Sequence, residues 1–153
     1  MALYQANFSI AGVNAADGVL FNLKTAASDR ATLREVGFFI QIASSNAPQY
    51  GLKRMNAVGT GSITVATPML CDAADGTASA GLETAWATLR PTVITAAGGR
   101  LAAVANTIGN GVIFDFSGPK GLVVPVSAGI CGVMLNASGA TTGTHCGYVV
   151  WEE

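Results

Sequence analysis

The chain has 153 residues, of which 50% are apolar and 11% charged, with a formal net charge of −1. A typical soluble domain carries about 25% charged residues, so this composition excludes the basic surface that binding to nucleic acid or to an anionic membrane requires. The length suits one domain, residues 1–153, that buries roughly 70% of the surface of its unfolded chain and needs no metal or disulfide to fold.

Short apolar runs separated by turn residues follow one another along the whole chain. They predict strands at residues 3–10, 18–25, 32–43, 50–55, 62–67, 84–89, 100–105, 111–116, 121–125, 129–136 and 144–152. Pairs such as Asp17-Gly18 and Gly98-Gly99 supply the residues that tight turns require. No window between the runs has helical spacing, so we expect an all-β protein, an antiparallel β-sandwich or jelly roll of about ten short strands.

The second and third predicted strands alternate with a period of two. Val19, Phe21 and Leu23 alternate with Leu20, Asn22 and Lys24, and Arg34, Val36, Phe38, Ile40 and Ile42 alternate with Glu35, Gly37 and Gln41. This period is typical of sheets that have one face toward a core. The last run ends at Glu152, so we expect the C-terminal segment to be held in a sheet.

Residues 70–81 form the only long polar stretch, and we expect a loop there. Within it, Asp72 and Asp75 precede a glycine, but they lack the spacing and the terminal glutamate of a calcium loop, which favours a simple turn. Residues 59–61, Gly-Thr-Gly, lie between two strands rather than before a helix. They therefore predict a hairpin turn and not a phosphate cradle.

The single histidine, His145, limits nucleophilic chemistry, because every Ser–His or Cys–His mechanism would have to use it. Its neighbour Cys146 cannot act with it, since adjacent residues of a strand point to opposite faces. No Gly-x-Ser-x-Gly sequence is present. We therefore expect His145 to be exposed or packed at a rim, and the protein to have no catalytic residues and not to be an enzyme.

A carboxylate pair for glycoside hydrolysis would have to come from the nine acidic residues. These are Asp17, Asp29, Glu35, Asp72, Asp75, Glu83, Asp115, Glu152 and Glu153. Most of them lie in predicted turns or at the C-terminal end. The sequence singles out no pair among them.

The three cysteines, Cys71, Cys131 and Cys146, match no zinc or redox spacing. We expect reduced, largely buried thiols in a protein made in a cytoplasm, with no bound metal or other cofactor. No window approaches the roughly 18 apolar residues of a membrane span, and residues 1–10 lack the basic and then apolar regions of an export signal. We therefore expect neither a membrane-spanning segment nor an export signal in this protein.

Aromatic and aliphatic residues occupy adjacent positions in two predicted strands. Phe38 and Phe39 must point to opposite faces, and the same holds along Val149, Val150 and Trp151. Either a covering loop or a subunit interface accounts for apolar residues on both faces. A surface poor in charge is typical of a protein covered by copies of itself or by a partner, so the candidate interface residues are Phe39, Val149 and Trp151.

Five segments carry a resemblance to a known class of proteins. They are Ala2-Leu3-Tyr4-Gln5, Leu33-Arg34-Glu35-Val36-Gly37-Phe38-Phe39, Gly111-Val112-Ile113-Phe114 followed by Gly121-Leu122-Val123-Val124-Pro125, and Gly147-Tyr148-Val149-Val150-Trp151-Glu152-Glu153. In order and spacing, over most of the chain, they resemble the small structural proteins of tailed bacteriophages. The resemblance implies a jelly-roll virion protein: a head decoration (cement) protein on the outside of the capsid, often a trimer, or a related tail module.

This resemblance also implies the partners and the location of the protein. The partners are other copies of the chain, as a homotrimer, and the major capsid protein, with no nucleic acid, membrane or small-molecule substrate. The protein would be made in the bacterial cytoplasm and end on the capsid exterior. The alternative is a tail or fibre module that recognises a host glycan or protein through loops such as 70–81 and 137–143, and a carbohydrate-binding module of a cellular enzyme is a third interpretation.

Overall fold

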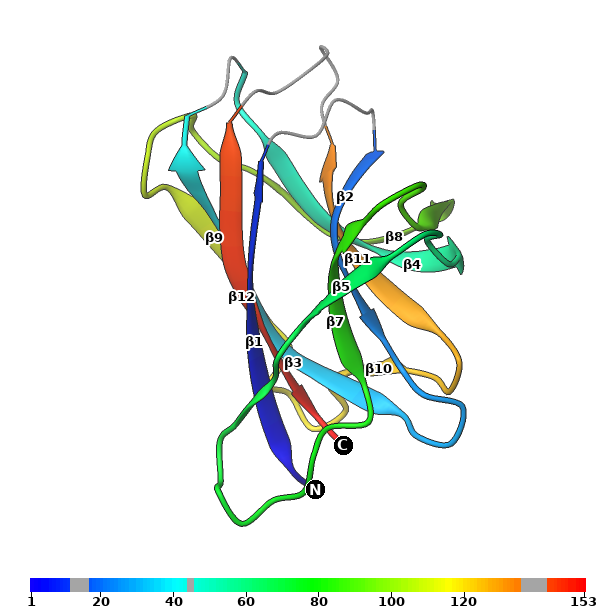
Figure 1. The fold of residues 1–153 in the computed structure, drawn as a ribbon. Helices are drawn as coiled ribbons and strands as arrows, with labels where there is room; N and C mark the ends of the chain where they lie inside the picture. Colours follow the sequence, from blue (N-terminus) through cyan, green and yellow to red (C-terminus); the bar gives the residue numbers. More distant parts are fainter. Residues whose placement is uncertain (12–16, 44–45, 136–142) are drawn as a thin grey trace.

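The computed structural model describes residues 1–11, 17–43, 46–135 and 143–153. Twelve strands and no helix occur in these residues. The strands are β1 (Leu3–Ala11), β2 (Asp17–Lys24), β3 (Ala31–Ile42), β4 (Gln49–Ala57), β5 (Ile63–Ala66), β6 (Met69–Leu70), β7 (Gly81–Trp86), β8 (Thr92–Ala103), β9 (Gly111–Asp115), β10 (Leu122–Val124), β11 (Gly129–Leu135) and β12 (Thr144–Glu152). They form two antiparallel sheets (Figure 1), which confirms the predicted all-β sandwich.

The strand pairings are nested along the described chain. Sheet I has the order β6-β1-β12-β3, with β9 and β10 one after the other along the far edge of β3, and sheet II has the order β5-β7-β2-β11-β4-β8. Thus β1 pairs with β12, β2 with β11, β3 with β9 and β10, and β4 with β8. Successive pairs lie in alternate sheets, as in a long antiparallel ribbon rolled into a sandwich.

Aromatic side chains fill the space between the two sheets. The rings of Phe8, Phe21 and Phe38 lie with their centroids 5.0 to 5.8 Å apart. Phe38 also stacks on Tyr50, with centroids 5.0 Å apart and planes within 12°. Because these rings come from β1, β2, β3 and β4, they join both sheets into one continuous core.

The first and last strands are fastened together at one end of the sandwich, where Figure 1 shows both termini. Ala2 and Glu153 exchange backbone hydrogen bonds of 2.8 and 3.0 Å. The Glu153 carboxylate also accepts bonds from the backbone N–H groups of Ser79 and Ala80, at 2.8 and 2.7 Å. It accepts a third from the Trp151 indole at 3.0 Å, so the loop between β6 and β7 is tied to the end of β12.

Irregularities in β2 and β3 interrupt the alternation that the sequence predicted. In β2, Phe21 and Val19 pair with consecutive residues of β11, so Leu20 is an extra residue. Val19 therefore turns to the outer face of sheet II, while Leu20 and Phe21 both enter the main core. A similar irregularity between β3 and β12 sends both Leu33 and Val36 into the core and leaves the two charged residues between them on the outer face.

A second, smaller hydrophobic cluster lies on the outer face of sheet II. Val19, Cys131 and Val133 are buried there beneath side chains from β4, β7, β8 and β11. Those covering side chains are Met55, Trp86, Val93 and Leu135. At this position the chain itself covers the apolar residues on both faces of β2 and β11, so no partner is needed to explain them.

Most predicted strand boundaries agree with the structure to within two residues, but β7 and β8 differ. Strand β7 runs from Gly81 to Trp86 instead of 84–89, and β8 begins at Thr92 rather than at residue 100. The Gly98-Gly99 pair, which we predicted to supply a turn, lies inside β8, where repeated register shifts against β4 accommodate it.

The prediction of a hairpin turn at residues 59–61 is wrong. Strands β4 and β5 flank this segment, yet they lie far apart in the order of sheet II. Residues 59–61 therefore lead the chain from one side of the sheet to the other. The two-residue strand β6 pairs with the edge of β1. It was not predicted, because this pairing depends on β1 and not on a local sequence pattern.

Candidate functional site

Two of the three predicted interface residues lie inside the protein. Val149 and Trp151 have no exposed surface and belong to the core between the sheets. Their assignment to an interface is therefore corrected, because a side chain enclosed by its own chain cannot contact a partner. Phe39 is half-buried and stacks on Tyr148, with ring centroids 6.3 Å apart. Its role in an interface stays a prediction.

His145 is buried and not exposed or packed at a rim as predicted. Its Nδ1 atom lies 2.6 Å from the Tyr50 hydroxyl, and its Nε2 atom has no hydrogen-bond partner among the described residues. Burial disfavours charge, so it lowers the pKa of His145 and raises that of Tyr50. The neighbouring Cys146 is half-buried, as expected for a residue on the other face of β12.

We expect acid to destabilise the protein through His145. The folded chain keeps this imidazole neutral, whereas the unfolded chain binds a proton near pH 6.5, so acid favours unfolding. The free energy of unfolding should fall below pH 6.5, by up to about 1.4 kcal/mol per pH unit, until the folded-state pKa is reached. Urea unfolding at about pH 7.5, 6.5 and 5.5 measures this slope. His145→Phe should flatten it, and an equal slope in the variant would contradict the prediction.

The cysteines and the Asp72 segment agree in part with expectation. Cys131 is buried and Cys146 half-buried, but Cys71 is exposed because it follows the edge strand β6 into a loop, and all three are free thiols. The Asp72 carboxylate accepts the backbone N–H of Ala74 at 2.9 Å, which makes this segment the turn that was predicted. In the described part of the chain, no group of three or more His, Cys, Asp or Glu residues is arranged to hold a metal ion.

A surface site forms beside the turn of residues 116–121 at the edge of sheet I. Both β9 and β10 pair with β3, and residues 116–121 leave the sheet between them. Gly121 closes this turn with φ at +55°, a conformation that favours glycine. The bulge in β3 places Arg34 and Glu35 together on the outer face next to the turn. The turn thereby separates two cavities.

The first cavity, which we call the acidic cavity, has a volume of about 520 Å³. It is lined by Leu3, Arg34, Glu35, Asp115, Ser117, Pro119, Val150 and Glu152. Arg34 donates through Nε to Glu152 at 2.8 Å and through Nη1 to the Gly118 carbonyl at 3.1 Å, so its charge is already engaged. With three carboxylates and one guanidinium, the lining has a formal charge of −2.

Hydrogen bonds hold two of the three carboxylates of the acidic cavity, Glu35 and Asp115. Glu35 and Asp115 are direct neighbours across β3 and β9. The Tyr148 hydroxyl donates to Glu35, which raises the pKa of Tyr148 to about 12. Asp115 accepts the backbone N–H of Ser117 at 2.7 Å, and the bonds from this residue lower the pKa of Asp115. Asp115 therefore remains ionised at neutral pH.

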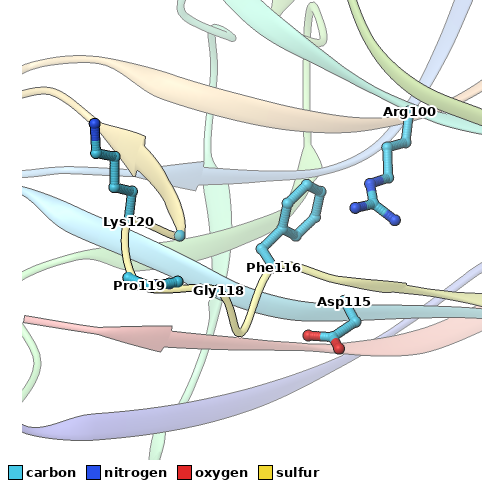
Figure 2. Close-up of a pocket in the computed structure, with 7 residues that line it drawn as sticks. Arg100, Asp115, Phe116, Gly118, Pro119 and Lys120 are labelled. Atoms are coloured by element: carbon cyan, nitrogen blue, oxygen red, sulfur yellow. The ribbon is translucent and has the colours of Figure 1, made fainter.

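The second cavity, of about 480 Å³, lies on the other side of the same turn (Figure 2). Figure 2 shows Phe116 between Arg100 and Lys120, with Asp115 below. The Arg100 guanidinium lies 5.0 Å from the centroid of the Phe116 ring, in a cation–π contact. Two cationic side chains and one carboxylate make this cavity basic, in contrast to its neighbour.

The site was not predicted from the sequence. Glu35, Asp115 and Glu152 are three of the nine acidic residues of the sequence. Their spacing in the chain gives no indication that they lie close together in the fold. Their meeting depends on a bulge in β3 and on the shared edge of β9 and β10, neither of which has a local sequence signal. The recognition loop expected at residues 137–143 lies, up to residue 142, outside the described residues.

The described residues contain no helix long and apolar enough to cross a membrane. Comparisons with protein-family models, with curated proteins and with solved structures find no match for this chain. Its function therefore has to be inferred from its strand order, its surface and the two cavities beside the 116–121 turn.

Proposed function

We propose that this chain is a structural protein of a tailed-bacteriophage particle, of the head decoration or cement type. It binds the outside of the capsid as an oligomer, preferably a trimer, and stabilises the assembled shell. The proposal assigns the chain no catalytic step and no cofactor. It rests on the resemblance of five sequence segments to this class and on the order of the strands.

The nested strand order is the observation that carries the proposal. The four nested pairs give the neighbour orders β1-β12-β3-β9/β10 in one sheet and β2-β11-β4-β8 in the other. We interpret this order as a jelly roll, with β5, β6 and β7 inserted between the fourth strand and its partner. Jelly rolls recur in viral capsid proteins and in lectins, so the order favours a particle component or a binding module over an enzyme.

One edge of the sandwich offers a surface for the protein–protein contacts that the proposal requires. Strand β5 lies on the edge of sheet II and β6 on the edge of sheet I, so residues 63–70 run from one sheet to the other (Figure 1). On this edge arm, Val65 and Met69 are 52% and 59% exposed. Exposed apolar side chains on two consecutive edge strands are typical of contact surfaces. Here the contact would be with the capsid protein or with other copies of the chain.

The stabilisation follows from binding linkage. A protein that binds the intact lattice but not the loosened one stabilises it by RT ln(1 + [L]/Kd) per site, about 2.7 kcal/mol at a hundredfold excess over Kd. A closed trimer would present the same contact to several neighbouring shell subunits. Such multivalency raises the overall affinity without any new kind of contact.

We expect particles assembled without this protein to form but to release their DNA at a lower temperature or after milder osmotic shock. Purified protein added back should restore resistance and saturate. Because the net charge is −1, raising the salt from about 0.05 to 0.5 M should weaken the effect little. DNA release on heating, followed with an intercalating dye, measures this.

A matched pair of variants tests the edge arm in the same assay. Met69 and Leu101 are similarly exposed, at 59% and 57%, but only Met69 lies on the arm. Met69→Lys should abolish the restored resistance, whereas Leu101→Lys should leave it intact. Deficient particles that are fully heat-stable yet fail to attach to cells would favour the tail-module alternative over the cement protein.

A further inference from the structure

We infer that the acidic cavity is a saccharide-binding site that takes a neutral sugar and disfavours an anionic one. This goes beyond the proposed role in the particle and does not depend on it. The cavity volume of about 520 Å³ falls within the usual range of small-molecule sites. The class of ligand follows from three properties of its lining: apolar side chains, carboxylates that can accept further hydrogen bonds, and an adjoining aromatic surface.

The aliphatic part of the lining consists of Leu3 and Val150, on the neighbouring strands β1 and β12. Leu3 keeps 37% of its surface exposed. Two aliphatic side chains on adjacent strands give this part of the cavity an apolar surface. The C–H face of a pyranose ring is an apolar surface of the same kind, so the two can be buried against each other.

The polar groups that remain available in the cavity are mainly hydrogen-bond acceptors. Arg34 is already engaged by Glu152 and by the Gly118 carbonyl. Glu35 and Asp115 are adjacent carboxylates, and ionised carboxylates only accept. The ligand must therefore supply donors, as sugar hydroxyls do, and such bonds to a carboxylate are strong. A formal charge of −2 in the lining opposes a ligand that carries its own negative charge.

An aromatic surface continues from the cavity along the same face of sheet I. Tyr148 is two residues from Val150 on β12, and its hydroxyl donates to Glu35. Its ring lies over Gly37, where a Cβ atom would come within 2.5 Å of the Tyr148 ring, and stacks on Phe39. Rings that lie along a sheet can stack on sugars, so this surface can extend the site from a single sugar ring to an oligosaccharide.

Titration of the full chain with trisaccharides, followed by amide NMR, tests the inference. The neutral probes are maltotriose and triacetylchitotriose, and sialyllactose is the anionic probe. We expect at least one neutral probe to shift the amide signals of residues around the acidic cavity and to bind more tightly than sialyllactose. If neither neutral probe shifts these signals at millimolar concentration, the inference is overturned.

Variants of the carboxylates make the test specific. Glu35→Gln and Asp115→Asn should each weaken binding roughly tenfold or more, because each removes a charged acceptor. Asp29→Asn is the matched control, since Asp29 does not line the cavity, and it should leave binding unchanged. Unchanged melting temperatures show that the variants are folded. Binding that neither cavity variant weakens overturns the assignment.

Tyr148 is a positioning residue in this scheme, because it acts through Glu35. Tyr148→Phe keeps the ring but frees Glu35, so it should weaken saccharide binding while retaining the preference for neutral probes. If a lysine-rich peptide binds to the acidic cavity and no neutral trisaccharide does, the inference is overturned. The ligand of the cavity would then be a basic segment of a protein partner. The capsid experiment reports on a different surface, so either proposal can fail without the other.

Discussion

Replacing Trp151 by alanine is expected to lower the free energy of unfolding by about 3–5 kcal/mol. The indole has no exposed surface, stacks on Tyr4 with centroids 5.8 Å apart, and donates to Glu153 at 3.0 Å. Alanine removes all of these contacts and leaves a cavity. The cavity cannot collapse easily, because β12 is held on both sides by β1 and β3. Urea unfolding of the variant and the parent protein measures the loss.

Trp86→Ala is the matched control for this substitution. Trp86 is half-buried at the small cluster on the outer face of sheet II, and its indole Nε1 has no hydrogen-bond partner among the described residues. The loss of free energy should therefore be clearly smaller than for Trp151→Ala. Equal losses would contradict the placement of Trp151 at the centre of the packing.

Gly147→Ala is expected to cost about 2–4 kcal/mol although it adds a single methyl group. A Cβ atom at Gly147 would overlap the carbonyl oxygen of Gly37 on β3 and come within 2.7 Å of Cζ of Phe8. The carbonyl belongs to the backbone of the neighbouring strand, so it can move only if the sheet distorts. Thermal unfolding should show the loss as a lower melting temperature.

Gly118→Ala provides the comparison for Gly147→Ala. No atom lies within 4 Å of a Cβ built on Gly118, so the change should stay within about 0.5 kcal/mol. The two substitutions add the same atoms and restrict the unfolded chain equally. A similar loss in both would mean that close approach of the strands is not what requires glycine at position 147.

Most strands could be predicted from the sequence because alternation and turn residues are local signals. Residues 144–152 were predicted as a strand and form β12 with the same bounds. Which of its faces is the inner one could not be predicted, since both carry apolar side chains. Val149 and Trp151 point inward, while Tyr148 and Val150 lie on the other face and keep part of their surface exposed. Only packing against the second sheet distinguishes the two faces.

The candidate site depends on the pairing of strands that are distant in the chain. For this reason no local pattern in the sequence predicts it. Glu35 and Asp115 are far apart in the chain, and they meet because β9 pairs with β3 in one particular register. A shift of that register by one residue would turn Asp115 to the other face. Glu152 joins them through Arg34, whose outward direction depends on the bulge in β3. These features arise from the assembled sheet and not from neighbouring residues.

The nested pairing also sets the time at which the protein can fold. The central strand of sheet I, β12, is the last described strand in the chain, and it separates β1 from β3. Until residues 144–152 have left the ribosome, β1 and β3 lack the strand that joins them, and the backbone edges that pair with β12 stay unpaired. Because such distant pairing is slow to form, we expect β1, β12 and β3 to join over milliseconds to seconds once residues 144–152 are available, rather than in microseconds.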